Sequence, residues 1–193
     1  MEVRGSFFAG RKAFITRQFG ELRWEQFLGG LAEREPIFGE QILVTTRVPV
    51  SAYLIFQDAL IREFFDGNDE AYWTIGEKSA EWALTEGPYK QYRNNPQSHK
   101  KFILQSLPLL WSAYYTKGET EFTLNESGVH HRIHGLPVRH ISFEYTNIGY
   151  LKKALQLIGL RRVTAKRIQG ISAGDQEIEY QISFSVPAMR RPR

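Results

Sequence analysis

The chain has 193 residues, of which 42% are hydrophobic and 13% aromatic, and its formal net charge is +4. This composition predicts a folded globular protein and excludes a disordered chain. The absence of cysteine excludes disulfides, cysteine nucleophiles and thiolate metal sites. No apolar run approaches the roughly 20 residues of a membrane span, so we expect a cytoplasmic protein.

The first two thirds of the chain show the spacing of amphipathic helices, because apolar side chains recur every three or four residues. The predicted helices cover residues 7–19, 24–31, 52–65, 72–82 and about 100–115. Ser51 is placed to cap the third helix. Pro108 lies inside the last helix and should kink or divide it. Residues 41–50 are predicted to be extended, and residues 91–98 to form a polar loop.

The last third changes to the period of two that is typical of β-strands. Residues 119–124 and 129–136 predict one β-hairpin, and residues 161–170 and 177–186 predict another. Apolar and polar residues alternate along 177–186, which requires a sheet with one solvent-exposed face. A helix closed by Gly159 connects the two hairpins.

This order of elements predicts an α+β fold. An N-terminal helical layer packs on a C-terminal four-stranded antiparallel sheet built as hairpin, helix, hairpin. We expect a single domain over residues 1–187, with a helical part at 1–116 and a β-hairpin/helix/β-hairpin part at 117–187. Residues 188–193 are expected to form a disordered basic tail.

Four of the five histidines lie between residues 128 and 140. On a strand, His130 and His134 face the same side but lie ~13 Å apart, too far to share a metal ion with ligand bonds of about 2.1 Å. His131 faces the opposite side. No carboxylate lies between positions 127 and 143 to complete a site. We predict no metal, and a polar strand with one partly buried imidazole.

The segment GISAG, residues 170–174, matches the Gly-x-Ser-x-Gly nucleophile elbow. That motif presents its serine between a strand and a helix. Here Ser172 is followed by an alternating strand, so we interpret the segment as a hairpin turn. We predict no catalytic residue and no enzymatic activity; a hydrolase that uses Ser172 or a His131/His140 pair is kept as a third hypothesis.

The segment GSFFAGRKA, beginning at Gly5, differs from a phosphate-binding loop. Arg11 stands where the lysine belongs, and Lys12 stands where serine or threonine belongs. No strand is predicted before the segment, and the residues between its glycines are apolar. We therefore interpret it as part of the first helix.

Basic residues of the last third form a candidate surface for an anion or nucleic acid. These residues are Lys152, Lys153, Arg161, Arg162, Lys166 and Arg167. Nucleic-acid binding would also need exposed aromatic side chains, and no recognised nucleic-acid module is present. A register that pairs Arg167 with Glu179 would neutralise part of this charge. Binding of an anion or nucleic acid is therefore the alternative function.

The four Trp, nine Tyr and thirteen Phe predict thick helix packing or a large apolar cavity. The candidate pocket residues are Phe102, Trp111, Tyr114, Phe143 and Tyr145. Each of them would serve equally well as an ordinary core residue.

Two segments resemble a myxobacterial-type family of unknown function. Residues 107–118 carry its pattern LP-x-LW-x-x-YY-x-x-G, and residues 149–159 carry its late G-[YW]-L-x-x-A-L-x-L-x-G helix. The resemblance covers nearly the whole chain. The layout is also similar to a wider superfamily of H-NOX sensor domains, vinyl-reductase-like sensor domains and TRAPP subunits.

The wider resemblance implies an apolar pocket between helices and sheet that binds heme, an aromatic compound or an acyl chain, or a surface for dimerisation. H-NOX domains hold heme through an axial histidine and a Tyr-x-Ser-x-Arg motif. Here the axial position falls near Trp111, and the motif is missing. Acylated TRAPP subunits use a cysteine, which this chain lacks. We predict no heme and no other cofactor.

These observations together predict a non-enzymatic regulatory or sensor-like domain. It is expected to hold a small apolar ligand or a protein partner. The resemblance also allows a homodimer formed through a helical face.

Overall fold

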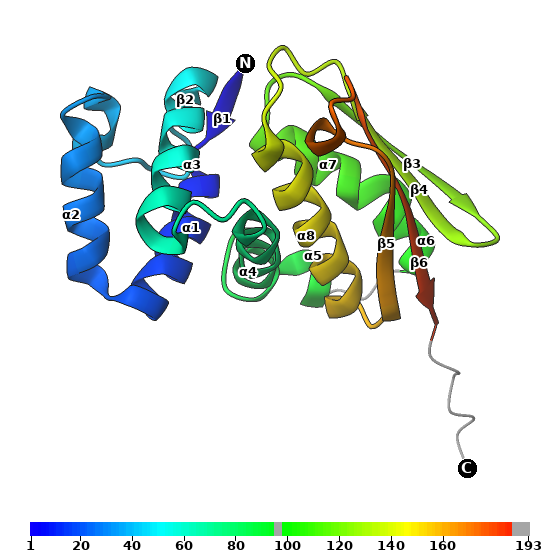
Figure 1. The fold of residues 1–193 in the computed structure, drawn as a ribbon. Helices are drawn as coiled ribbons and strands as arrows, with labels where there is room; N and C mark the ends of the chain where they lie inside the picture. Colours follow the sequence, from blue (N-terminus) through cyan, green and yellow to red (C-terminus); the bar gives the residue numbers. More distant parts are fainter. Residues whose placement is uncertain (95–97, 187–193) are drawn as a thin grey trace.

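A helical layer packs against one face of an antiparallel sheet in the computed structural model of the chain (Figure 1), which describes residues 1–94 and 98–186. This arrangement confirms the predicted α+β fold. The expected tail at 188–193 and the middle of the expected loop at 91–98 lie outside the described residues. Within the described part, none of the helices combines the length and the apolar character that crossing a membrane requires.

The N-terminal third contains the predicted helices. It also contains a small sheet that the sequence did not predict. Its elements are β1 (Glu2–Arg4), α1 (Ser6–Phe19), α2 (Glu21–Ala32), the 3₁₀ turn η1 (Pro36–Gly39), β2 (Arg47–Pro49) and α3 (Val50–Phe65). Strands β1 and β2 pair antiparallel, with buried Val3 opposite buried Val48. Only the end of the stretch expected to be extended is therefore a strand. Ser51 does not cap α3, because the helix already begins at Val50.

The middle third begins with α4 (Ala71–Thr85) and the short helices α5 (Gln91–Asn94) and α6 (His99–Lys101). Helix α5 replaces the first half of the loop expected at 91–98. A π-helical segment, η2 (Phe102–Ser106), then precedes α7 (Leu107–Tyr114), with Pro108 in the first turn of α7. The proline lacks the N–H that would continue the earlier hydrogen-bond ladder, so the helix is divided there as predicted.

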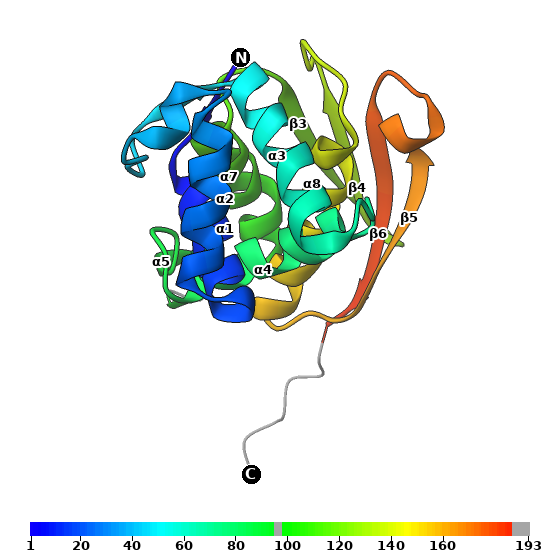
Figure 2. The same cartoon turned by 60° about the vertical axis from the view of Figure 1, so that its left-hand side comes forward.

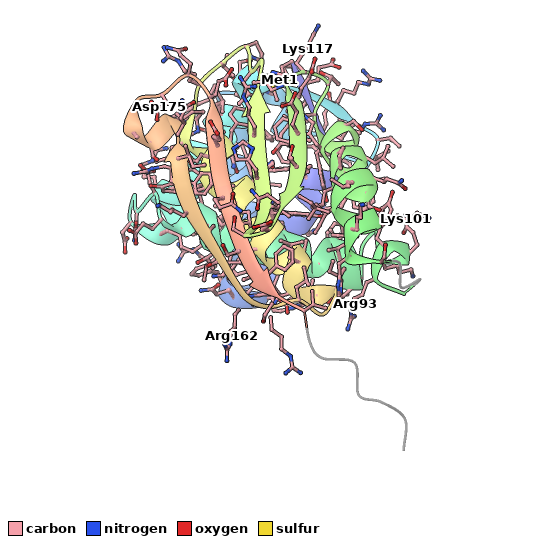
Figure 3. The ribbon with its side chains drawn as sticks, turned by 90° about the vertical axis from the view of Figure 1, so that its right-hand side faces the viewer. Met1, Arg93, Lys101, Lys117, Arg162 and Asp175 are labelled. Atoms are coloured by element: carbon pink, nitrogen blue, oxygen red, sulfur yellow. The ribbon has the colours of Figure 1, made fainter. Side chains whose placement is uncertain are left out.

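The last third forms a four-stranded antiparallel sheet in the order β3-β4-β6-β5. Its strands are β3 (Glu119–Asn125), β4 (Gly128–His134), β5 (Arg161–Gln169) and β6 (Ile178–Ser185), with the 3₁₀ turn η3 (Ile171–Ala173) between β5 and β6. The alternation along β6 buries Ile178, Tyr180 and Ile182 on one face. No helix of the described chain covers the opposite face, where polar and charged side chains project away from the ribbon (Figure 3).

Helix α8 (Ile141–Leu157) connects the two hairpins and lies between the sheet and α4 (Figures 1 and 2). Helices α4 and α8 pack closely through glycines. A Cβ atom on Gly76 would lie 2.1 Å from the Thr146 carbonyl oxygen, and one on Gly149 would lie 2.2 Å from the Trp73 carbonyl oxygen. Only glycine permits this approach of two backbones.

Candidate functional site

A cavity of about 50 Å³ lies between the helical layer and the inner face of the sheet. Helices α1, α4, α7 and α8 and strands β3 and β4 all contribute side chains to its wall. Most of these side chains are apolar or aromatic, such as Phe7, Leu110 and Trp111. The polar members include Arg11, Ser79, His131 and Thr146. The cavity therefore combines an apolar wall with a few buried polar groups, as ligand sites do.

Arg11 is the only Arg, Lys, Asp or Glu side chain in the wall of this cavity, among the residues that the structure describes. The residue is 1% exposed. Its Nη1 donates to Ser79 Oγ, and its guanidinium lies 3.4 Å from the centre of the Phe7 ring. Its Nε and Nη2 have no hydrogen-bond partner. Burial lowers the pKa of Arg11, while nearby tyrosines, Tyr53 first, act in the opposite direction.

Ser79 is oriented by its own helix. Its hydroxyl group donates to the Ile75 carbonyl oxygen at 2.7 Å, which leaves its lone pairs to accept from Arg11. The serine thus binds one edge of the guanidinium and supplies no negative charge. Arg11 remains a buried cation without an anionic partner among the residues that the structure describes.

His131 enters the cavity wall from β4 and is 3% exposed. Its ring stacks on Phe122 with centroids 4.4 Å apart, and its Nε2 lies 2.9 Å from Thr120 Oγ1. Its Nδ1 has no partner. Burial, assisted by His130, lowers the pKa of His131 from 6.5 to about 3. The imidazole is therefore neutral near pH 7, and it is more deeply buried than the sequence predicted.

This low pKa of His131 predicts a pH-dependent stability. Between pH 6.5 and about 3 the unfolded chain binds a proton at His131 that the folded chain does not. The free energy of unfolding should therefore fall by about 1.4 kcal/mol for each pH unit below 6.5, or about 2 kcal/mol by pH 5. A His131→Phe variant should lack this part of the pH dependence of the free energy of unfolding.

Urea denaturation of both proteins at a series of pH values measures the difference between them. A Thr123→Ala variant changes an exposed side chain of the same hairpin that does not titrate and should keep the wild-type dependence. Parallel curves for the wild type and His131→Phe would contradict the prediction.

His130 and His134, on the outer face of the sheet, pair with carboxylates on neighbouring strands. His130 Nε2 lies 2.6 Å from Glu179 Oε1, and His134 Nε2 lies 3.3 Å from Glu121 Oε1. The sequence alone did not give these cross-strand partners. In the described part of the chain, no three His, Cys, Asp or Glu side chains are grouped to hold a metal ion.

Asp58, His140 and Ser142 are joined in the order of a catalytic triad. His140 Nε2 lies 2.9 Å from Asp58 Oδ1, and its Nδ1 lies 2.8 Å from Ser142 Oγ. The same Nδ1 accepts the Ser142 backbone N–H, so His140 caps α8. Ser142 is fully buried. A substrate cannot reach its hydroxyl group, and the contact stabilises the helix start.

Ser172 of the GISAG segment lies in the turn η3 and contacts no imidazole within the described chain. Its Oγ donates to Glu144 Oε1 at 2.8 Å and accepts from Arg167 Nη1 at 2.6 Å. No hydrogen bond joins His131 to His140 either, because each ring binds a hydroxyl group of its own. The contacts therefore give no support to the third hypothesis, a hydrolase.

The five candidate pocket residues lie in three different surroundings. Trp111 and Tyr114 line the cavity. Phe102 and Phe143 are fully buried in the core and do not belong to the cavity wall. Tyr145 lines a separate open cleft between α1, α4 and the β5–β6 edge of the sheet. A role for any of them in binding stays a prediction.

The six basic candidate residues are partly neutralised. Lys152 Nζ lies 2.9 Å from Glu77 and Lys153 Nζ lies 3.5 Å from Glu81, both on α4. Arg167 is opposite Tyr180, because an irregularity between Arg161 and Thr164 shifts the register. The anticipated pairing with Glu179 is therefore wrong, and Arg167 lies 3.9 Å from buried Glu144 instead.

The remaining three basic residues, Arg161, Arg162 and Lys166, are exposed on or beside β5. Arg162 projects beyond one end of the sheet (Figure 3). They form a small surface, and its role in binding an anion or nucleic acid stays a prediction.

The helical layer, the four-stranded antiparallel sheet and the interposed α8 together form an H-NOX-like fold. The chain is similar to an H-NOX protein from S. oneidensis in the Fe(II) state, with a TM-score of 0.73, 12% identity and coverage of 94% of this chain and 96% of that one. The same protein in its Fe(II)NO state gives a TM-score of 0.72 at 14% identity, covering 94% and 99%. An unliganded Fe(II) H-NOX protein from K. algicida gives 0.66 at 11% identity, covering 97% and 100%.

These similarities concern the fold alone. No family model matches the sequence, and no curated protein matches it. The specific resemblance to a myxobacterial-type family therefore stays a prediction, while the likeness to H-NOX domains in the fold is established.

The residues of this cavity do not fit a heme. Pockets that enclose organic ligands usually measure 300–1,000 Å³, roughly six times this cavity or more. Trp111 and Tyr114 occupy its helical wall, and Phe122 stacks directly on His131, the only imidazole that the described residues contribute to this wall. A macrocycle would have to displace these rings before His131 could approach iron.

Proposed function

We propose that this protein is a non-enzymatic, sensor-like domain that holds a small molecule between its helices and its sheet. The observation that carries the proposal is the cavity itself, with an apolar wall and buried polar atoms that have no partner in the chain. Such atoms lose their hydration on folding, and a bound ligand or water would restore their hydrogen bonds. A purely structural core rarely leaves several of them unpaired.

The same wall is poorly equipped for acid–base catalysis. No carboxylate lines the cavity among the described residues. Its one imidazole has a pKa of about 3, far below the range that suits a general base near pH 7. Binding without chemical conversion is therefore the better-supported role.

Ligand occupancy could be transmitted through α7 and α8. Both helices line the cavity, and both also pack against the sheet. A ligand that binds one arrangement of these helices more tightly shifts the population toward that arrangement. The domain would then report the ligand to a protein partner or to a second copy of itself.

The alternative function, binding of an anion or nucleic acid by the surface basic residues, has weaker support. Lys152 and Lys153 already pair with α4, and Arg167 binds the Glu144 and Ser172 side chains. Phosphate contacts would have to come from the few basic residues that remain free of such pairs.

Filling the cavity is the direct test of the proposed function. Native mass spectrometry of the purified protein should show an added mass that denaturation releases, and a visible absorption spectrum should report any chromophore. In Leu110→Phe a larger side chain enters the cavity wall, so the added mass should be lost. Leu60→Phe enlarges a buried residue that does not line the cavity and should retain it.

Two outcomes would contradict the proposed function. One is an added mass that Leu110→Phe retains as fully as Leu60→Phe. The other is a protein of bare mass whose thermal stability no small molecule raises in a screen of neutral and charged compounds.

A further inference from the structure

Arg11 is a buried charge that the chain leaves uncompensated. An ion taken out of water costs several kcal/mol unless a partner of opposite charge accompanies it. An arginine does not escape this cost by losing its proton, because its pKa is too high. The contacts with Phe7 and Ser79 offset part of the cost, yet neither group carries a negative charge.

The free atoms of Arg11 form one edge of the guanidinium. Nη1 is bound to Ser79, whereas Nε and Nη2 have no partner. The N–H bonds of Nε and Nη2 are parallel and lie on the same side of the group, which matches the two oxygens of a carboxylate. The described residues of the protein therefore bind one edge of Arg11. The other edge, which suits a planar oxyanion, is left without a hydrogen-bond partner.

Four further residues of the wall have a buried polar atom without a hydrogen-bond partner among the described residues: Ser6 Oγ, His131 Nδ1, Thr146 Oγ1 and Tyr150 Oη. Thr146 Oγ1 is buried without a partner and is able to donate a hydrogen bond. His131 Nδ1 is also buried without a partner. When Thr120 donates its hydroxyl hydrogen to Nε2, the neutral imidazole carries its proton on Nδ1 and is a donor as well.

We propose that the cavity binds a small planar monoanion of the carboxylate type through the Nε and Nη2 edge of Arg11. This inference rests on the proposed function, since it names the ligand class of the same cavity. A single negative charge balances the single positive charge of Arg11, whereas a divalent anion would leave an excess charge in an apolar wall. The volume of about 50 Å³ admits a few non-hydrogen atoms, the size of formate or acetate.

The experiment titrates the full chain with sodium formate and sodium acetate. Sodium gluconate, whose anion is too large for the cavity, keeps the ionic strength constant. Isothermal calorimetry and thermal unfolding are the readouts. Acetate or formate should raise the Tm of the wild type saturably and give one binding site per chain. Arg17→Met changes an exposed arginine on the same helix and should behave like the wild type.

Variants of Arg11 identify the binding edge. Arg11→Met removes the charge with little change of shape. Its affinity for acetate and formate should be lower than that of the wild type by about tenfold or more. Without anion this variant should be at least as stable as the wild type, because a buried unpaired charge has been removed. Arg11→Lys keeps a charge but lacks the two parallel donors, so it should bind more weakly than the wild type, and it provides a second comparison if Arg11→Met does not fold.

Acetamide, the neutral analogue of acetate, separates this inference from the proposed function. Binding of acetamide without binding of acetate would overturn the inference that the ligand is an anion. The cavity would then be a site for neutral molecules. Binding of neither compound, with no ligand retained on purification, would overturn both. Equal anion binding by Arg11→Met and the wild type would assign the anion to another surface and overturn the inference.

Discussion

Gly149→Ala is expected to destabilise the folded protein by about 3 kcal/mol and to lower its Tm by roughly 6–12 °C. The new Cβ atom would lie 2.2 Å from the carbonyl oxygen of Trp73 and close to the Trp73 Cα as well. These are backbone atoms, so no rotamer change relieves the contact, and α8 must move away from α4. Both helices line the cavity through Ser79 and Thr146, so their separation would also reduce ligand binding.

The control is a glycine in a helix with open space around it. Gly29 in α2 has nothing within 4 Å of its Cβ position. Gly29→Ala should stabilise the protein by about 0.5–1 kcal/mol, because alanine restricts the unfolded chain and favours the helix. Thermal and urea denaturation of the two variants measure the contrast. A Gly149→Ala protein as stable as the wild type would show that α4 and α8 do not pack through their backbones.

The sequence predicted the fold class because its strongest patterns are local. Alternation along residues 177–186 defines β6, and helical spacing defines α1, α3 and α8. Pro108 marked the division of the helix before α7. The β1–β2 sheet was missed because each strand has only three residues and its partner lies more than 40 positions away. Such pairing depends on tertiary contacts that no short window contains.

The site was harder to predict than the fold. Trp111 and Tyr114 follow from the apolar face of one helix, but the segment around Arg11 indicates only a departure from a phosphate-binding loop. The sequence does contain a signal that Arg11 is buried. Arg11 is four residues after Phe7 and four before Ile15, so it lies on the buried stripe of α1. A charged residue on such a stripe indicates a buried charge, whereas the absence of a partner for it is visible only in three dimensions.

Glu144→Ala is expected to cost about 3–5 kcal/mol of stability. Glu144 is fully buried on α8. Its carboxylate accepts hydrogen bonds from the Ser172 backbone N–H at 2.8 Å and from the Tyr180 hydroxyl group at 2.6 Å. Burial, together with the hydrogen bond to Glu144, raises the pKa of Tyr180. Truncation would leave the buried Tyr180 hydroxyl group and the partly buried Ser172 N–H without this acceptor and would open a space beneath the turn.

The effect of Glu144→Ala should be local as well as global, because Glu144 joins α8 to the turn between β5 and β6. A Cβ atom on Gly170 would lie 2.4 Å from Glu144 Oε1, so the turn closes directly over the carboxylate. Hydrogen exchange should accelerate most at the Ser172 amide and along β5. Glu144→Gln keeps the shape but loses the charge, and a smaller loss of about 1–3 kcal/mol is expected.

Glu25→Ala on the exposed side of α2 is the matched control and should change stability by less than about 0.5 kcal/mol. If Glu144→Ala cost no more than this control, the carboxylate would not secure the turn. The sheet edge would then be held by strand pairing alone. The expected order of stability, Glu25→Ala above Glu144→Gln above Glu144→Ala, follows from the number of buried donors that each variant leaves without an acceptor.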